Sequence, residues 1–332
     1  TMKAFVIEHF GAPDSFHLAD LPKPELLPNH VLIKVAATSI NRVDTMIRQG
    51  VVADIAPDFP AVLHGDVAGV IEAVGNNVNA FKVGNEVYGC AGGVKGTGGA
   101  LAEYMLADSN LIAHKPKSLT MAEAAALPLV SITAWEGLID RAQVQSGQKV
   151  LVYGGTGGVG HLGIQLAKWA GAEVYATVSS EEKAAIALTL GADVPINYTD
   201  TTTEEFVAQY TDGKGFDLVF DTVGNDNLQH AFQAVKLNGT VVSTVSTSQQ
   251  DLSLMHAKGL TLHLVYMLLP MLSGINRSNH GKILVKLAEL VDQGQIRPLL
   301  DDKTFTFSEV AAAHAHLESG QAIGKIVLNQ SF

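Results

Sequence analysis

A glycine-dense turn near the middle of the chain limits the possible folds more than any other stretch. The apolar run Val150–Tyr153 leads into it, and Gly155, Gly157 and Gly160 satisfy the pattern G-x-G-x-x-G. Apolar residues then recur at helical spacing over His161–Ala170. Strand, turn and helix in this order suit a pyrophosphate, because glycines let the backbone approach closely and a helix N-terminus favours negative charge. We therefore predict a dinucleotide site. The residues expected to contact the dinucleotide are Gly155, Thr156, Gly157, Gly158, Val159 and Gly160.

Strand-like and helix-like segments alternate after this turn. The apolar, β-rich runs are Glu173–Val178, Asp193–Asn197, Phe216–Asp221 and Thr240–Val245, and Leu260–Val265 is expected to add a sixth strand. Such alternation indicates a parallel sheet covered by helices on both faces and joined by right-handed crossovers. The fold class is therefore α/β, with a doubly wound parallel-sheet (Rossmann) cofactor domain over residues 123–267.

The remainder of the chain has a different pattern. Residues 2–120 consist of short β-rich segments separated by proline- and glycine-rich turns, interrupted by a helical stretch that ends at Gly50. Residues 92–99 are so rich in glycine that we expect a mobile surface loop, which could border a substrate cleft. The last segment has no sheet of its own to complete. We expect it to return to the first domain, so that residues 1–122 and 268–332 form one β-rich unit.

Composition excludes several classes of function. A chain of 332 residues is longer than one core usually organises, so two domains are expected. The net charge of −11 disfavours nucleic acid and anionic membranes as partners, and no apolar run reaches the ~20 residues of a membrane span. We expect a cytoplasmic protein that acts on small molecules. Cys90 is the only cysteine, so we expect a small buried hydrophobe there and no disulfide.

Three passages together resemble the medium-chain dehydrogenase/reductase superfamily: Gly65–Gly75, Gly155–Gly160 and Gly324–Val327. Within it, the chain is most similar to the zinc-independent quinone oxidoreductases, whose short motifs match Ser39–Asn41, Gly65–Gly69, Thr133–Trp135 and Ile196–Tyr198. The resemblance implies a GroES-like, β-rich catalytic domain beside the Rossmann domain. It also implies a homodimer in which the cofactor-domain sheet continues through its last strand.

The resemblance also identifies where zinc alcohol dehydrogenases hold their catalytic metal. Asn41 and Gly65 stand at the positions of a cysteine and a histidine ligand, and one cysteine cannot supply a second, structural zinc site. His64 lies one residue from the required place, where a hydrogen-bonded structural role is favoured. His314 and His316, two residues apart on a predicted helix, should point to different faces and cannot chelate one ion. We therefore predict no metal.

Without a metal, the resemblance implies an NAD(P)H-dependent reductase of quinones or α,β-unsaturated carbonyls. These electrophiles accept hydride readily, and hydrogen-bond donors can stabilise the oxyanion that forms. Donors to this small-molecule acceptor are expected from the early helix at Asn41, Asp44 and Arg48, and Thr133 matches a position that faces the cofactor. Each has a structural alternative: Asn41 as a helix cap, Asp44 paired with a neighbour, and Arg48 as a solvated charge. The alternative functions are a zinc-type alcohol dehydrogenase with unusual ligands and a non-catalytic dinucleotide-binding protein.

The choice of cofactor depends on the end of the second strand of the cofactor domain. An NAD enzyme places an acid there, but this strand ends in Ser179 and Ser180. Hydroxyl groups can donate to a 2′-phosphate, so we expect NADP(H); NAD(H) remains the alternative if Glu181 or Glu182 supplies the acid. Lys183 and Tyr198 match family positions near that phosphate. The resemblance places further cofactor contacts at strand ends: Gly224, Asn225, Ser243, Thr244, Val265 and Tyr266.

Overall fold

The computed structural model describes all of residues 1–332, and they form two compact units. The first unit combines Thr1–Ile132 with Leu268–Phe332, and the second is Thr133–Met267. The predicted boundary between the two domains lies after residue 122. Helix α2 (Met121–Ala125) packs on strands β3 (His30–Ser39) and β4 (Asp66–Val74), so the first unit extends beyond that residue.

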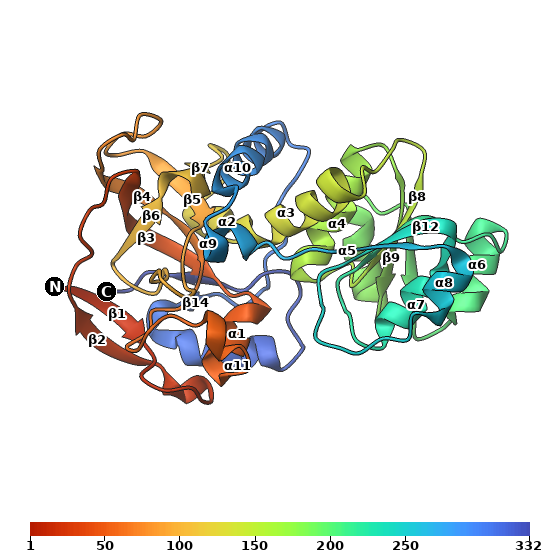
Figure 1. The fold of residues 1–332 in the computed structure, drawn as a ribbon, viewed down its shortest axis with the longest axis horizontal. Helices are drawn as coiled ribbons and strands as arrows, with labels where there is room; N and C mark the ends of the chain where they lie inside the picture. Colours follow the sequence, from red (N-terminus) through yellow and green to blue (C-terminus); the bar gives the residue numbers. More distant parts are fainter. The chain divides into compact units, whose positions relative to one another are not determined.

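The second unit, called the cofactor unit below, contains one six-stranded parallel sheet in the order β10-β9-β8-β11-β12-β13. Strands β8, β9 and β12 of this sheet are labelled in Figure 1. Because β9 and β10 follow β8 on one side and β11 to β13 follow on the other, the topological switch point lies between β8 and β11. The predicted doubly wound sheet is confirmed, sixth strand included. Its strands are β8 (Lys149–Tyr153), β9 (Glu173–Val178), β10 (Val194–Asn197), β11 (Phe216–Asp221), β12 (Val235–Ser243) and β13 (Thr261–Leu264).

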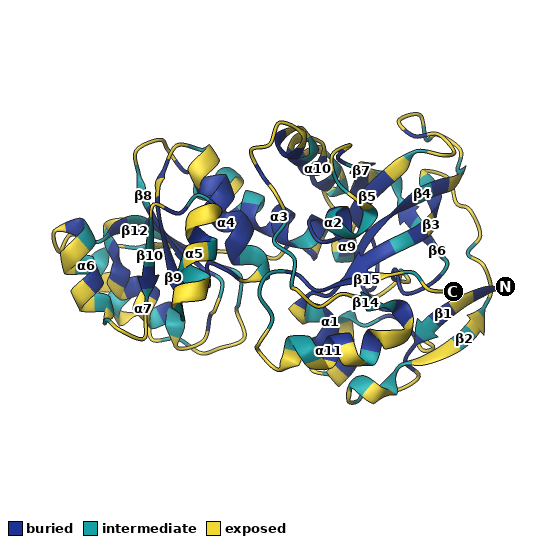
Figure 2. Ribbon diagram, turned by 180° about the vertical axis from the view of Figure 1, so that it is seen from behind, coloured by how far each residue is buried: buried dark blue, intermediate teal, exposed yellow.

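Helices cover this sheet because their apolar positions pack on the strands. Helix α4 packs on β8 and β9, and α7 packs on β11 and β12. One buried cluster includes Tyr175, Phe206, Phe216 and Phe232. The strands of this sheet are largely buried and are drawn mostly in dark blue in Figure 2. The helices of this unit are α4 (Gly158–Trp169), α5 (Glu181–Thr189), α6 (Thr203–Thr211), α7 (Asn227–Ala234) and α8 (Ser253–Lys258). Helix α3 (Pro128–Trp135) spans the boundary between the units and continues into a π-helical turn, Glu136–Arg141.

The first unit is β-rich, as predicted. Its larger sheet has the order β14-β15-β3-β4-β5-β7, and β6 pairs with β3; β1 and β2 form a separate hairpin. The C-terminal segment does return to this unit, since β15 pairs antiparallel with β3. The remaining strands are β1 (Met2–Val6), β2 (His17–Leu21), β5 (Glu86–Cys90), β6 (Tyr104–Asp108), β7 (Ile112–His114), β14 (Phe305–Thr306) and β15 (Val327–Asn329). The remaining helices are α1 (Arg42–Gln49), α9 (Leu269–Ser273), α10 (Arg277–Asp292) and α11 (Val310–Glu318).

One local prediction is wrong. The stretch at 92–99 is not a mobile surface loop: Gly92, Gly93, Val94 and Gly99 are buried, and backbone hydrogen bonds join Gly93 to Thr97 and Gly99 to Val62. Gly92, Gly93 and Gly99 pack closely against neighbouring backbone, whereas Gly96 and Gly98 are exposed. None of the helices is both long and apolar enough to cross a membrane.

Candidate active site

Two glycines of the turn pack closely against neighbouring parts of the chain. Strand β8 ends at Tyr153, and Gly157 is the N-cap of α4. A Cβ atom on Gly160 would lie 1.8 Å from the carbonyl oxygen of Gly154, and one on Gly155 would lie 2.9 Å from Ala176 Cβ. Contacts this short exclude any side chain at Gly160, so the turn can keep its shape only with glycine there.

The chemistry of this turn suits a pyrophosphate. The N–H of Gly155 donates to Thr177 O and that of Gly157 to Gly154 O, but Gly158 and Val159, in the first turn of α4, have no acceptor within the chain. Free N–H groups and the positive end of the helix dipole together favour an anion. The turn also follows β8 at the topological switch point, where ligands of open parallel sheets bind.

A second polar cluster forms where β9 and β10 end. Ser180 caps α5 by accepting a hydrogen bond from the N–H of Lys183, whose ammonium donates to Ser179 Oγ over 3.2 Å. Tyr198 follows β10 and is 56% exposed, and its N–H donates to Val178 O. Strand β9 ends at Val178 as predicted, so Glu181 is an exposed residue of the first turn of α5 and not a strand-end acid.

The other predicted cofactor residues lie at the same edge of the sheet, after β11, β12 and β13. Asp221 Oδ1 accepts hydrogen bonds from the N–H groups of Val223 and Gly224, and Gly224 and Asn225 both have positive φ. Ser243 is buried beside Asp221, where its Oγ lies 3.4 Å from Oδ2. Thr244 N donates to Asp221 O and Val265 N to Ser243 O; Tyr266 is half-exposed. Their contacts with a dinucleotide remain predictions.

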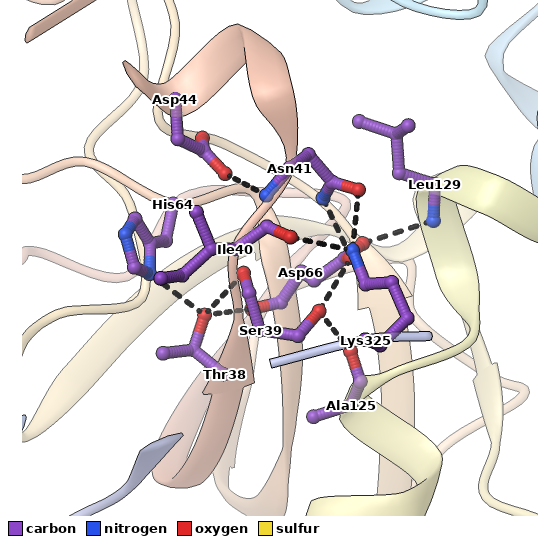
Figure 3. Close-up of polar contacts among 10 residues, drawn as sticks. All are labelled: Thr38, Ser39, Ile40, Asn41, Asp44, His64, Asp66, Ala125, Leu129 and Lys325. Atoms are coloured by element: carbon purple, nitrogen blue, oxygen red, sulfur yellow. Dashed lines mark hydrogen bonds and ion pairs between the residues drawn. The ribbon is translucent and has the colours of Figure 1, made fainter. Parts of the chain in front are cut away.

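In the first unit, Asn41 stands at the N-cap of α1 and is nearly buried. Its Nδ2 donates to Asp66 Oδ2 over 2.8 Å, and its Oδ1 accepts from Lys325 Nζ over 2.5 Å (Figure 3). Its side chain is therefore part of a polar network that continues through the start of β4 and the C-terminal segment.

Asp66 is the centre of that network. Its Oδ2 also accepts from Ser39 Oγ, and its Oδ1 accepts from the N–H of Leu129 (Figure 3). The ammonium of Lys325 lies 3.8 Å from Oδ2 and donates to Ile40 O over 2.7 Å. Burial raises the pKa of Asp66 and lowers that of Lys325, while each charge favours the charged form of the other.

Asp44 accepts a hydrogen bond from the N–H of Asn41 through Oδ2, over 2.7 Å, so it pairs with a neighbour as one alternative foresaw. Burial raises the pKa of Asp44 to about 7, assisted by the nearby charge of Asp66. A fraction of Asp44 is therefore protonated near neutral pH, and a protonated carboxyl can donate a hydrogen bond.

Arg48 is not a solvated charge, because its side chain is 1% exposed. Its guanidinium forms an ion pair with Glu318, donates to Gly11 O and donates to His314 Nδ1 over 2.9 Å. Arg48 therefore fastens α1 to α11. Its predicted contact with substrate remains untested, and these contacts favour a structural role.

Two of the buried histidines of this unit, His64 and His314, form a directed chain. A guanidinium can only donate, so His314 Nδ1 accepts from Arg48 and its Nε2 carries the proton. That proton points to His64 Nε2, 2.8 Å away, which leaves His64 Nδ1–H facing Thr38 Oγ1 at 3.4 Å. Burial lowers the pKa of His64 to about 3 and that of His314 well below its ordinary value. The neutral pair is a structural element.

Comparison with known proteins places the chain in a family. Two family models match it, an alcohol dehydrogenase GroES-like domain at residues 27–117 and a zinc-binding dehydrogenase at residues 190–328. The 2-methylene-furan-3-one reductase of Solanum lycopersicum is 37% identical over 99% of this chain and 79% of that protein. The chain belongs to the medium-chain dehydrogenase/reductase superfamily.

Other relatives place this oxidoreductase among the quinone and enone oxidoreductases of the superfamily. The chloroplastic NADPH-dependent alkenal/one oxidoreductase of Arabidopsis thaliana is 36% identical over 98% of this chain and 79% of that protein. The quinone oxidoreductase of Homo sapiens is 30% identical over 98% and 97%. A crystal structure of an alcohol dehydrogenase superfamily protein from Novosphingobium aromaticivorans superimposes with a TM-score of 0.94, at 40% identity, over 99% of each chain.

The zinc site of the superfamily does not fit the residues of this member. The Asn41 side chain is already bonded to Asp66 and Lys325, and a Cβ on Gly65 would lie 2.8 Å from both Cys90 Sγ and Gly92 O, so no histidine can stand there without displacing its neighbours. No group of three His, Cys, Asp or Glu side chains could hold an ion. His316 binds Asp301 over 2.8 Å while His314 binds Arg48 and His64, so the two histidines do point apart.

Lys325, Asp66 and Ser39 were not predicted as site residues of this superfamily member, although the motifs that carry the resemblance include them. The position of Lys325 next to the apolar run Ile326–Leu328 could have indicated a buried lysine. A fully buried lysine is almost always paired, so it would also have indicated a charged partner. Thr133 lies in α3 at the start of the cofactor unit and is buried. Its predicted position against the cofactor remains untested.

Proposed function

We propose that this protein is an NADPH-dependent oxidoreductase that transfers hydride to a quinone or an α,β-unsaturated carbonyl without a metal. The observation that carries the proposal is the replacement of both zinc-ligand positions, by a bonded amide at Asn41 and by a glycine at 65 that has no room for a side chain. Acceptors that are already electrophilic need no Lewis acid. The names of the tomato, Arabidopsis and human relatives point to the same substrate classes.

In this proposal the cofactor supplies the hydride, and the chain's own residues bind, orient and stabilise charge. The turn at Gly155–Gly160 holds the pyrophosphate through the first N–H groups of α4. Asn41 donates from Nδ2 to the acceptor oxygen that becomes negative. Asp44 can donate as well in its protonated form, which its pKa of about 7 makes accessible.

The preference for NADPH over NADH rests on the cluster after β9. Ser179, Ser180 and Lys183 place two hydroxyls and an ammonium where an NAD enzyme has an acid, and Glu181 lies beyond the strand end. The Arabidopsis relative is NADPH-dependent by name. The variants Lys183→Met and Ser179→Ala should each raise the KM for NADPH while leaving that for NADH unchanged.

We further propose a homodimer that forms along β13. This strand is the edge of the sheet, so one row of its backbone groups has no strand partner, and Leu264 and Tyr266 are about half-exposed beside it. Light scattering coupled to size exclusion should give twice the chain mass of 35.0 kDa. A monomer at micromolar concentration would contradict this.

The deciding experiment is a steady-state screen with NADPH and NADH against quinones, enones and aldehydes. We expect acceptor-dependent NADPH oxidation with quinones or enones in protein treated with a chelator. Turnover that requires added zinc would support an alcohol dehydrogenase instead. Cofactor binding without turnover above the uncatalysed rate would support a non-catalytic protein.

A further inference from the structure

Two opposite charges lie buried beside Asn41. Lys325 is 3% exposed and Asp66 is fully buried. Taking a lysine and a carboxylate out of water costs several kcal/mol per ion, and an apolar pair of similar volume is often as stable. Because such a pair adds little to the free energy of unfolding, we expect a second role for it. Both charged groups contact the side chain of Asn41.

The contacts fix the orientation of the Asn41 amide. Its oxygen accepts from the ammonium of Lys325, and its nitrogen donates to the carboxylate of Asp66 (Figure 3). Turning the amide over would place its NH₂ group against the ammonium and its oxygen against the carboxylate. Both contacts would then be repulsive, so the two charges select one orientation.

This orientation leaves one hydrogen available. Nδ2 carries two hydrogens, Asp66 accepts one, and the chain offers no acceptor for the other. The ammonium on Oδ1 also polarises the amide, and hydrogen bonds in such a chain strengthen one another. The two charges therefore fix the direction of the free N–H of Asn41 and make it a stronger hydrogen-bond donor.

We propose that Lys325 and Asp66 are positioning residues that act through Asn41, holding its carboxamide so that the free Nδ2–H donates to the oxygen of the acceptor. The inference rests on the proposed function, in which Asn41 stabilises the charge that develops on that oxygen. It explains why a buried lysine follows Gly324 in a segment that is otherwise apolar: the C-terminal segment supplies the cation that orders the N-terminus of α1.

The alternative is a purely structural role. Lys325 precedes β15, and its bond to Ile40 O alone could fasten this segment to the end of β3. The two roles differ in what they predict when Asn41 is absent. A positioning residue loses its effect on kcat once the residue it positions is removed, whereas a structural residue does not.

The test is a double-mutant cycle on kcat, with NADPH and the best acceptor of the screen. Asn41→Ala and Lys325→Met should each lower kcat by up to about 100- to 1,000-fold, which is the scale of losing one oxyanion donor. The double variant N41A/K325M should be no slower than N41A, and the KM for NADPH should be unchanged throughout. Multiplicative losses in the double variant would overturn the proposal.

A second variant covers the loss of folding that an unpaired Asp66 can cause. Replacing both charges, in D66N/K325M, should return the melting temperature toward that of the wild type, while kcat stays as low as in N41A. Recovery of kcat together with the melting temperature would also overturn the proposal. Lys34→Met, at an exposed position on β3, is the matched control and should leave kcat unchanged. If the wild type itself turns over no acceptor, the proposed function fails instead.

Discussion

Replacing Gly160 by alanine tests the cofactor site most directly. The new Cβ would stand 1.8 Å from Gly154 O, and this separation has to grow to 3.0 Å or more before the contact is tolerable. Gly154 and the first turn of α4 must therefore move apart by more than an ångström. Such a movement misaligns the N–H groups of Gly158 and Val159 that are proposed to face the pyrophosphate.

The expected loss follows from the number of hydrogen bonds. Each bond to a charged group is worth about 1.5–3 kcal/mol, so losing two raises the Kd for NADPH by more than about 100-fold. Isothermal titration calorimetry measures the Kd, and far-UV circular dichroism checks that the unit is folded. Gly98→Ala is the control, because no atom lies within 4 Å of the added Cβ. If Gly160→Ala binds NADPH within threefold of the wild type, the steric argument is refuted.

Three further predictions concern buried ionisable side chains of the first unit. The pKa of Asp44 in the folded protein is about 7, above its unfolded value, so its contribution to the free energy of unfolding is present at low pH and is lost as pH rises through 7. Asp44→Asn should therefore raise the melting temperature more at pH 8 than at pH 5. The pKa of His64 in the folded protein is about 3, so the free energy of unfolding falls as the pH drops below 6.5, by about 1 kcal/mol at pH 5.5. Any deficit of His64→Asn against the wild type should thus shrink on acidification, as thermal unfolding at the two pH values would reveal; a constant deficit would contradict the depressed pKa. Arg48→Met leaves Glu318 with only the hydrogen bond from Gln49 Nε2 and leaves His314 Nδ1 without its donor, so it should lower the free energy of unfolding by about 1–3 kcal/mol in denaturant titrations. An unchanged midpoint would show that these contacts contribute nothing.

The parts of the fold that were predicted correctly depend on neighbours in sequence. Glu173–Val178 and Phe216–Asp221 match the observed strands because each is an apolar run bounded by breakers. The glycine turn was predictable for the same reason.

The candidate site was harder to predict, because its partners are distant in sequence. Lys325 reaches Asn41 across 284 residues and Arg48 reaches His314 across 266. No local pattern reports such pairs, so Arg48 could be taken for an exposed charge. The prediction for residues 92–99 was wrong for a related reason, since Gly92, Gly93 and Gly99 pack against the backbone of Leu63, His64 and Gly98.

The return of the C-terminal segment sets the order in which the chain can be completed during synthesis. Asp44, Arg48 and Asp66 leave the ribosome early, but Lys325, His314 and Glu318 follow only after the whole cofactor unit has been made. Until then, the acids at the start of α1 and β4 have no cation to neutralise them. The sheet of the cofactor unit needs no later residue, so it can fold first, and the first unit is completed last. A truncation that removes residues 325–332 therefore removes the ammonium of Lys325 from Asn41, which lies near the opposite end of the sequence.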